Sequence, residues 1–213
     1  RLGIPTPSVK PTVSVNAASN ADAGAITNDV SYVYTFVLGT GEEGPPSAAS
    51  DIVQMANGQT ATLSNMNTTI PTHPSGSGTV NYYTTGLKRR IYRSNTGSTN
   101  TEFQLVKDIS SGSTTTDNAD ADALGEILPS TTWIGPPDDN SSAYPDGQML
   151  GLTFIANGVF AGFSGRMLCF SEPFLPHAWP ADYRLTLEKN IVGLGVTTNG
   201  IAVMTEGSPY FVG

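Results

Sequence analysis

The chain has 213 residues, including 23 glycines and 15 prolines, and only 13% of its residues are charged. Strong helix formers do not dominate, so this composition favours short strands joined by turns over long helices. The formal net charge of −8 argues against a surface that grips phosphate backbones. The single cysteine, Cys169, excludes an internal disulfide, and no apolar run is long enough for a membrane-spanning helix.

The segment 1–28 is predicted to be an extended entry segment, and its first part, which contains Pro5, Pro7 and Pro11, is predicted to be a linker or an entering edge strand. After it, β-branched and aromatic runs alternate with turn signals, and the Asn57-Gly58 pair predicts a hairpin between two of these runs. The predicted strands are Ser31–Leu38, Asp51–Met55, Thr60–Leu63, Leu87–Arg93, Glu102–Ile109 and Thr114–Asp117.

Six or seven short strands within residues 29–123 predict an all-β domain of the immunoglobulin-like sandwich type. The segments Tyr32–Phe36, Gly44-Pro45-Pro46-Ser47, Ile91-Tyr92-Arg93 and Leu105-Val106 resemble a fibronectin type III domain. Residues 124–147, rich in aspartate and containing Pro136-Pro137, predict a linker to a second domain at residues 148–213.

An internal repeat marks this second domain. Gly151-Leu152 matches Gly193-Leu194, Asn157-Gly158 matches Asn199-Gly200, and Leu168-Cys169-Phe170 matches Tyr210-Phe211-Val212, always at a spacing of 42 in the numbering. Each copy reads as three strands joined by turns, and Tyr183–Leu187 predicts a fourth strand. Such a period is typical of β-propeller blades, with a second small β-sandwich as the alternative. Because a propeller needs at least four blades, we expect a fragment of a longer chain or sheets completed by other chains.

Candidate catalytic residues centre on His177, a potential general base that Glu172 or Asp182 would orient. No Gly-x-Ser-x-Gly elbow supplies a nucleophile. Three prolines nearby favour the alternative, a rigid loop in which Phe174 and Trp179 anchor on a core.

Acidic and basic groups predict structural roles. Asn118, Asp120 and Asp122 have the first spacings of a calcium loop, but its glycine and final glutamate are replaced by Ala123 and Pro129. A solvated linker is therefore expected there, as at Asp138-Asp139, and a hydrated turn at Glu42-Glu43. The basic cluster Lys88-Arg89-Arg90 with Arg93 predicts a salt-bridging strand or a subunit contact. Cys169 is predicted to be a buried side chain, and we attach no function to the glycan-acceptor patterns at Asn67 and Asn140.

One family resemblance covers most of the chain. Its most specific part is Ser171–Pro180, and it is supported by Ala161-Gly-Phe-Ser-Gly165, Tyr183-Arg-Leu185 and Thr205–Tyr210, with the stretches Tyr32–Ser47 and Arg90–Ser94 upstream. These segments resemble structural virion proteins of tailed bacteriophages, and the family is similar to the tail tubular B, or nozzle, proteins of short-tailed phages. The resemblance implies a β-propeller with inserted β domains that assembles as a hexameric tube below the portal and adaptor and conducts DNA.

The sequence therefore predicts a structural component of a phage tail, assembled in the bacterial host cytoplasm, without catalysis, cofactor or metal. Its expected partners are other copies of itself, neighbouring tail or adaptor proteins, and transiting DNA that it does not bind specifically; no membrane contact is expected. The alternative is a receptor- or glycan-binding tail module whose exposed aromatic residues stack on sugars, with Trp133, Trp179, Tyr82-Tyr83 and Tyr144 as candidates. A third reading, a hydrolase acting through Glu172 and Asp182, is the least favoured.

Overall fold

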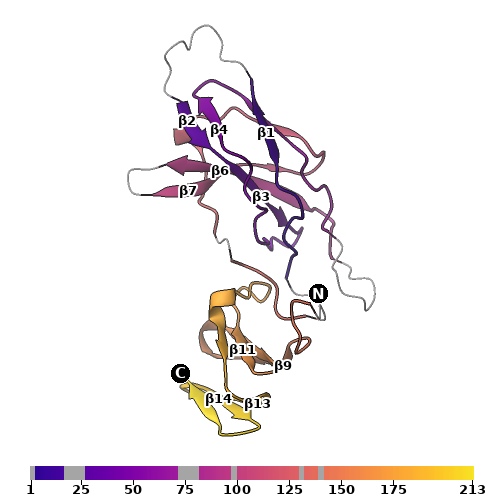
Figure 1. The fold of residues 1–213 in the computed structure, drawn as a ribbon, viewed down its shortest axis with the longest axis vertical. Helices are drawn as coiled ribbons and strands as arrows, with labels where there is room; N and C mark the ends of the chain where they lie inside the picture. Colours follow the sequence, from indigo (N-terminus) through magenta and orange to yellow (C-terminus); the bar gives the residue numbers. More distant parts are fainter. Residues whose placement is uncertain (1–2, 17–26, 72–81, 97–99, 130–131, 139–141) are drawn as a thin grey trace. The chain divides into compact units, whose positions relative to one another are not determined.

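The computed structural model describes residues 3–16, 27–71, 82–96, 100–129, 132–138 and 142–213 (Figure 1). The prediction of an all-β protein is confirmed, because the regular elements of these residues are strands in antiparallel sheets and three short 3₁₀ turns. The chain divides into two compact units. We call the described residues between 6 and 129 the N-terminal unit, and residues 132–213 with residues 3–5 the C-terminal unit.

The N-terminal unit contains three antiparallel sheets. Strands pair in the orders β1-β5-β8, β2-β4 and β3-β6-β7. The first two strands lie where the sequence predicted only an extended segment or its end. The strands are β1 (Thr12–Val15), β2 (Thr27–Val30), β3 (Tyr32–Val37), β4 (Val53–Ala56), β5 (Ala61–Ser64), β6 (Lys88–Thr96), β7 (Thr101–Ile109) and β8 (Thr115–Asp117).

Strand β3 is buried on both faces, which matches its run of aromatic and β-branched residues. One of its edges pairs with β6, and the segment after β3 runs along the other. Pro45 and Pro46 have no backbone N–H to donate. Along this edge the Ser47 and Ser50 N–H groups donate to the Tyr34 and Tyr32 carbonyls. The hydroxyls of Ser47 and Ser50 accept hydrogen bonds from the N–H groups of Tyr34 and Tyr32 at 3.2 and 3.0 Å.

The predicted hairpin at Asn57-Gly58 is wrong, although the turn itself exists. Gly58 has the positive φ (84°) that such a turn requires, and the Gln59 N–H donates to the Ala56 carbonyl. However, β4 pairs with β2, whereas β5 pairs with β1 and β8, so the turn joins strands of two different sheets. The turn geometry also differs from that of an Asn-Gly hairpin, because Asn57 does not have the positive φ that a type I′ turn needs at both central residues.

The residues predicted as a linker are packed against the two units. Gly125 N–H donates to the Leu105 carbonyl, and Leu128, only 8% exposed, joins a buried cluster with Val33 and Tyr92. Further along, the Pro137 carbonyl accepts a hydrogen bond within the C-terminal unit from the Met149 N–H. Strands β6 and β7 stay paired as far as Thr96 and Thr101, beyond the ends predicted at Arg93 and Glu102.

The C-terminal unit contains two antiparallel meanders. The first has the order β12-β11-β10-β9, and its edge strand β12 coincides with the predicted fourth strand. The second has the order β13-β14-β15. Their strands are β9 (Leu150–Phe154), β10 (Phe160–Ser164), β11 (Met167–Phe170), β12 (Arg184–Thr186), β13 (Ile191–Thr197), β14 (Gly200–Thr205) and β15 (Tyr210–Val212).

The two meanders share one buried cluster. Side chains of the first meander, Ala161, Phe163 and Leu168, pack together with Ile191, Ile201 and Val203 of the second. The packing of two consecutive antiparallel sheets is the arrangement that the repeat predicted; closure into a propeller, like the sandwich type of the N-terminal unit, stays a prediction.

The predicted register of the repeat is wrong by one position. A spacing of 42 would carry the pair Gly162↔Cys169 of the first meander to Met204↔Phe211 of the second, whereas the observed pairs are Val203↔Tyr210 and Ala202↔Phe211. These pairs instead follow Gly162↔Cys169 and Ala161↔Phe170 at a spacing of 41.

The difference arises in the first turn of each meander. In the first, Asn157 and Gly158 both have positive φ (63° and 77°), and the Ile155 N–H bonds to the Val159 carbonyl around the turn. In the second, Thr197 pairs directly with Gly200, and Asn199 does not have a positive φ. One residue fewer in the second turn shifts every later strand by one.

Candidate functional site

A buried ion pair lies at the centre of the N-terminal unit. The Arg93 guanidinium donates to Asp117 Oδ2 at 2.7 Å, and the Tyr32 hydroxyl donates to the same oxygen at 2.8 Å. The Asp117 side chain is 0% exposed and that of Arg93 5%. Arg93 lies opposite Tyr32 on paired strands β3 and β6, and Asp117 ends β8 in another sheet. Burial and the negative charge of Asp117 raise the pKa of Tyr32 well above its usual value, so the phenol stays protonated.

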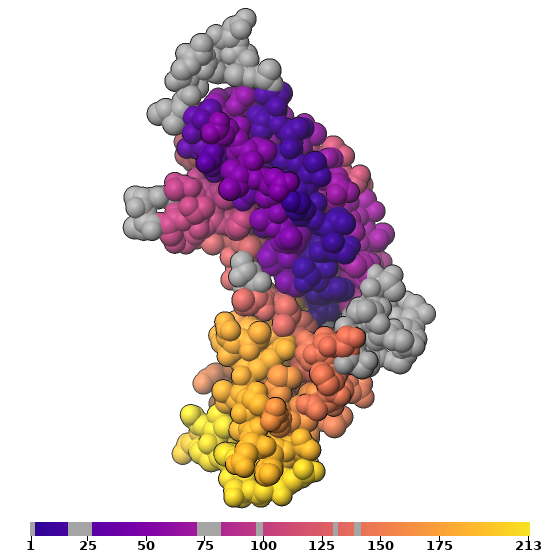
Figure 2. Space-filling model, in the orientation of Figure 1, coloured from indigo at the N-terminus to yellow at the C-terminus, as the bar shows by residue number. Residues whose placement is uncertain are grey.

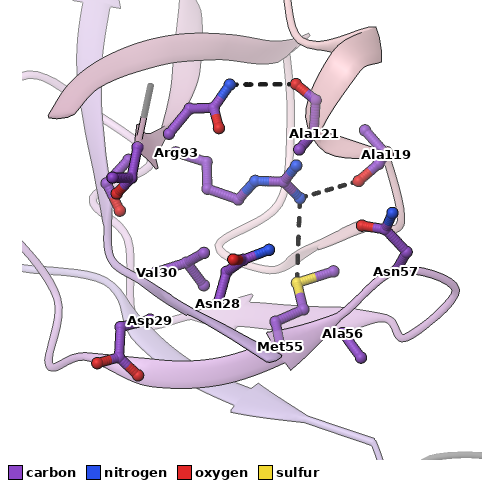
Figure 3. A pocket seen from close by; sticks show the side chains of 12 residues that line it. Asn28, Asp29, Val30, Met55, Ala56, Asn57, Arg93, Ala119 and Ala121 are labelled. Carbon is purple, nitrogen blue, oxygen red and sulfur yellow. Dashed lines mark hydrogen bonds between the residues drawn. The ribbon is translucent and has the colours of Figure 1, made fainter. Parts of the chain in front are cut away.

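A pocket of about 130 Å³ opens beside this ion pair (Figure 3). Its wall is formed by the ends of β2, β4 and β6 and by the segment after β8. Within it, Arg93 also donates to the Ala119 carbonyl at 3.0 Å and contacts the Met55 sulfur at 4.0 Å. Asn95 donates to the Ala121 carbonyl at 3.1 Å.

The chemistry of this pocket is that of a structural crevice. Its lining residues contain no histidine or cysteine, and its guanidinium is already committed to Asp117. The one carboxylate among the lining residues, Asp29, is exposed on β2, and Arg93 is the only other ionisable group among them. Acid–base catalysis needs a second titratable group within hydrogen-bond reach, so the pocket has room for a few water molecules but no catalytic pair.

A second buried cluster overturns the hydrated turn predicted at Glu42-Glu43. Glu43 is only 6% exposed, and its carboxylate accepts hydrogen bonds from Tyr92 Oη (2.6 Å), Thr35 Oγ1 (2.7 Å) and Arg90 Nη1 (2.8 Å). Burial, the hydrogen bond to Glu43 and its charge raise the pKa of Tyr92. The turn-like composition around Glu43 gives no indication of this role, because its hydrogen-bond partners on β3 and β6 come close to it only in the folded chain.

The basic residues of β6 serve the fold, in agreement with the predicted salt-bridging strand. Lys88 and Arg90 pair with Asp108 at 3.3 Å, and Arg90 also pairs with Glu43. Arg89, 2% exposed, donates to the Asn67 carbonyl. A nucleic-acid site would use such charges unpaired, whereas Arg89 and Arg93 are buried and Lys88 and Arg90, which are partly exposed, are paired with carboxylates of the unit.

His177 lies in a rigid loop of the C-terminal unit. It is 6% exposed, and its ring meets that of Trp133 edge to face with centroids 6.3 Å apart. Glu172 accepts a hydrogen bond from the Trp133 indole at 3.3 Å, while Asp182 is exposed in a 3₁₀ turn. These contacts fit the rigid-loop alternative.

The anchors of this loop are not both as predicted. Trp179 is fully buried and donates to the Pro176 carbonyl at 2.8 Å. Phe174, by contrast, is 78% exposed with a φ of 61°, so its predicted place in a core is wrong. Its ring lies over Gly158, where a Cβ would meet it at 2.6 Å, and its N–H donates to the Gly158 carbonyl.

The remaining candidates are placed as follows. Asp120 and Asp122 belong to an exposed or half-exposed stretch around a short 3₁₀ turn, and the part of the chain that the structure describes holds no group of three His, Cys, Asp or Glu side chains suited to a metal ion. Asp138 is half-buried; Asp139 and Asn140 lie outside the described residues. The side-chain amide oxygen of Asn67 (Oδ1) is used internally, accepting from the Ser8 N–H and the Tyr34 hydroxyl.

Cys169 is fully buried, as predicted, and burial raises its pKa to about 11. Of the aromatic residues proposed to stack on sugars, Trp179 is enclosed and Tyr144 lies under the Arg184 guanidinium, 5.5 Å from its ring centroid. Trp133 and Tyr82 are half-buried, and Tyr83 is 60% exposed.

Comparisons with known proteins give no family. No protein-family model matches the chain, and no curated protein matches it either. Within the described ranges, no helix has the length and apolar character needed to cross a membrane.

Proposed function

We propose that this protein is a structural component of a bacteriophage tail that assembles with other copies and with neighbouring tail or adaptor proteins into a conduit for DNA, without catalysis. The observation that supports the proposal most is the distribution of exposed apolar side chains. Of the large apolar side chains that are exposed among the described residues, ten of thirteen belong to the C-terminal unit. These are Leu150, Leu152, Phe154, Phe174, Tyr183, Leu185, Val192, Val196, Met204 and Phe211.

This distribution suits a building unit better than a free monomer. Leu150, Leu152 and Phe154 lie along the edge strand β9 and are each more than half exposed. Contiguous apolar surface on sheet edges and faces favours association, since burial in an interface removes it from water. The polar clusters around Glu43 and Asp117 support the same role, because they stabilise a sheet and leave no acid–base pair open to a substrate.

The charge of the chain fits a conduit. With 18 acidic and 10 basic residues, its average field repels phosphates, so a duplex would slide rather than stick. Three of the four basic residues of β6, Lys88, Arg90 and Arg93, are paired with carboxylates, and Arg89 is buried, which limits what they add to this field.

Light scattering coupled to size exclusion, with negative-stain microscopy of the purified chain, tests the proposal. We expect closed oligomers, hexameric by resemblance, and weaker assembly in a Leu152→Ser/Phe154→Ser variant. A matched Ile52→Ser variant, which changes a side chain 70% exposed in the other unit, should assemble like the parent. A monomer from micromolar to near-millimolar concentration would contradict the proposal, as would binding of duplex DNA at physiological salt. A tryptophan fluorescence response to host glycans would support the alternative receptor-binding role.

A further inference from the structure

The pairing of strands identifies equivalent positions in the two meanders of the C-terminal unit. Opposed residues on paired strands share a face of the sheet. Ala161 is opposed to Phe170 in the first meander, as Ala202 is to Phe211 in the second. Because both members of the second pair follow the first at a spacing of 41, these faces are topologically equivalent, and Met204 is the counterpart of Phe163.

This face has opposite environments in the two meanders. In the first, Ala161 is 0% and Phe163 7% exposed, and Phe170 packs against their cluster. In the second, Met204 is 47% and Phe211 61% exposed. Equivalent side chains are therefore covered in one sheet and open in the other; the yellow residues of Figure 2 form the surface of the second meander.

The cover of the first meander shows what kind of surface fits this face. It is the opposite face of the second meander, which contributes Ile201, Val203 and, partly buried, Leu194. A row of β-branched and aliphatic side chains thus packs onto Ala161, Phe163 and Phe170. The exposed face of the second meander is therefore equivalent to the face of the first meander that the second meander covers.

The open face is also shaped to accept a close neighbour. Met204 and Ala202 lie opposite Gly193 and Gly195, so half of this surface has no side chains. A Cβ at Gly193 would meet nothing within 4 Å, and one at Gly195 would meet only Ala202 at 4.0 Å. Glycine lets another backbone or a large side chain approach a sheet closely.

We propose that the face of the second meander formed by Ala202, Met204 and Phe211 is a docking surface for another antiparallel sheet, whose contact face carries Ile, Val and Leu side chains. The same aliphatic face of a second copy is not available, because Ile201 and Val203 are buried in each copy by its own first meander. The partner is a sheet of this chemistry outside the described residues, and cover by another face of a second copy, such as the exposed strand β9, is an outcome that the test distinguishes. The inference deepens the proposed building role, on which it rests for its biological purpose.

A maleimide reporter at Met204 tests the docking. The only native thiol, Cys169, is fully buried with its pKa raised to about 11, so a Met204→Cys variant presents one reactive thiol. The probe for the partner sheet is the chain's own second meander: the segment 173–213 is repeated directly after Gly213, which keeps the observed spacing of 41 between meanders. The control reporter is Val196→Cys, 48% exposed at the hairpin end of the same sheet and on the opposite face.

We expect the added sheet to slow alkylation in the Met204→Cys variant by at least about tenfold, with that of Val196→Cys unchanged. A Phe211→Asp change in the extended chain should restore the rate. Equal alkylation of Met204→Cys with and without the addition would overturn the proposal, whether hydrogen exchange finds the added copy folded or unfolded. So would slower alkylation of the unextended variant at higher protein concentration, because a second copy would then cover the face. The assay works within one chain, so a failed assembly test leaves its outcome unaffected.

Discussion

Replacing Asp117 by asparagine tests whether the buried ion pair holds the N-terminal unit together. The change keeps the shape of the side chain and removes its charge. In the native protein, Asp117 accepts three hydrogen bonds: from Arg93 at 2.7 Å, from Tyr32 at 2.8 Å and from the Ala119 N–H at 2.9 Å. The asparagine Oδ1 can accept only part of this set, and the asparagine NH₂ group, itself a donor, would face other donors.

The magnitude follows from the burial of both partners. Removing one member of a buried ion pair leaves the other charge unpaired, which costs about 3–5 kcal/mol. Because Arg93 keeps the Ala119 carbonyl as a partner, we expect the lower end, about 3 kcal/mol, or on the order of a hundredfold in the unfolding equilibrium. The matched change is Asp51→Asn, which breaks the 2.6 Å pair with Lys10; its side chains are 88% and 47% exposed. That change should cost less than about 1 kcal/mol.

Urea unfolding followed by hydrogen exchange of peptides from β3 and β6 measures both variants. Exchange of the β10 and β11 peptides, from the other unit, serves as an internal reference. A triple variant, Tyr32→Phe/Arg93→Met/Asp117→Leu, removes the charges and the hydroxyl together and should recover most of the lost stability, since a well-packed apolar cluster replaces an ion pair at little cost. If Asp117→Asn destabilises the unit no more than Asp51→Asn, the ion pair is not a main support of this fold.

Three further outcomes follow from other contacts. The contribution of Tyr32 and Tyr92 to the free energy of unfolding should be constant below about pH 10 and fall above it by about 1.4 kcal/mol per pH unit for each, because burial and the adjacent carboxylates raise their pKa values and only the unfolded chain releases these protons. Urea titrations at increasing pH check this, and a flat profile above about pH 10 contradicts it. Cys169 should resist alkylation at pH 8 in the native protein and react fully in urea, because burial raises its pKa to about 11; rapid native labelling would place it at the surface. Gly158→Ala should cost about 1–2 kcal/mol in thermal unfolding, because its φ is 77° and the added methyl meets the Phe174 ring; an unchanged midpoint would show that the ring moves freely.

The patterns predicted best are those set by neighbours in the chain. The aromatic and β-branched run Ser31–Leu38 located β3, and the Thr114–Asp117 run located β8, because strand propensity depends on residues that are adjacent in the chain. The turn at Asn57-Gly58, in which Gly58 has a positive φ, was also predicted, because a turn likewise depends on residues that are adjacent in the chain.

The errors concern contacts between distant residues. Glu43 was expected in water because its neighbours form a turn, yet Arg90 and Tyr92, far along the chain, take it into the interior. Likewise, the sequence around Asp117 does not indicate its hydrogen-bond partners, because Tyr32 and Arg93 belong to two other strands. A buried charge is tolerated only where the completed fold supplies its hydrogen bonds.

The repeat shows the same division within one feature. Two successive antiparallel meanders were legible in the amino-acid order, because each is a run of local strands and turns. The correct register could not be predicted, because the turn between Thr197 and Gly200 has one residue fewer than the first turn of the first meander. This difference moves the later strands from a spacing of 42 to 41. Side chains alternate faces at every residue, so that single step decides that Ile201 and Val203 are buried while Met204 and Phe211 meet solvent.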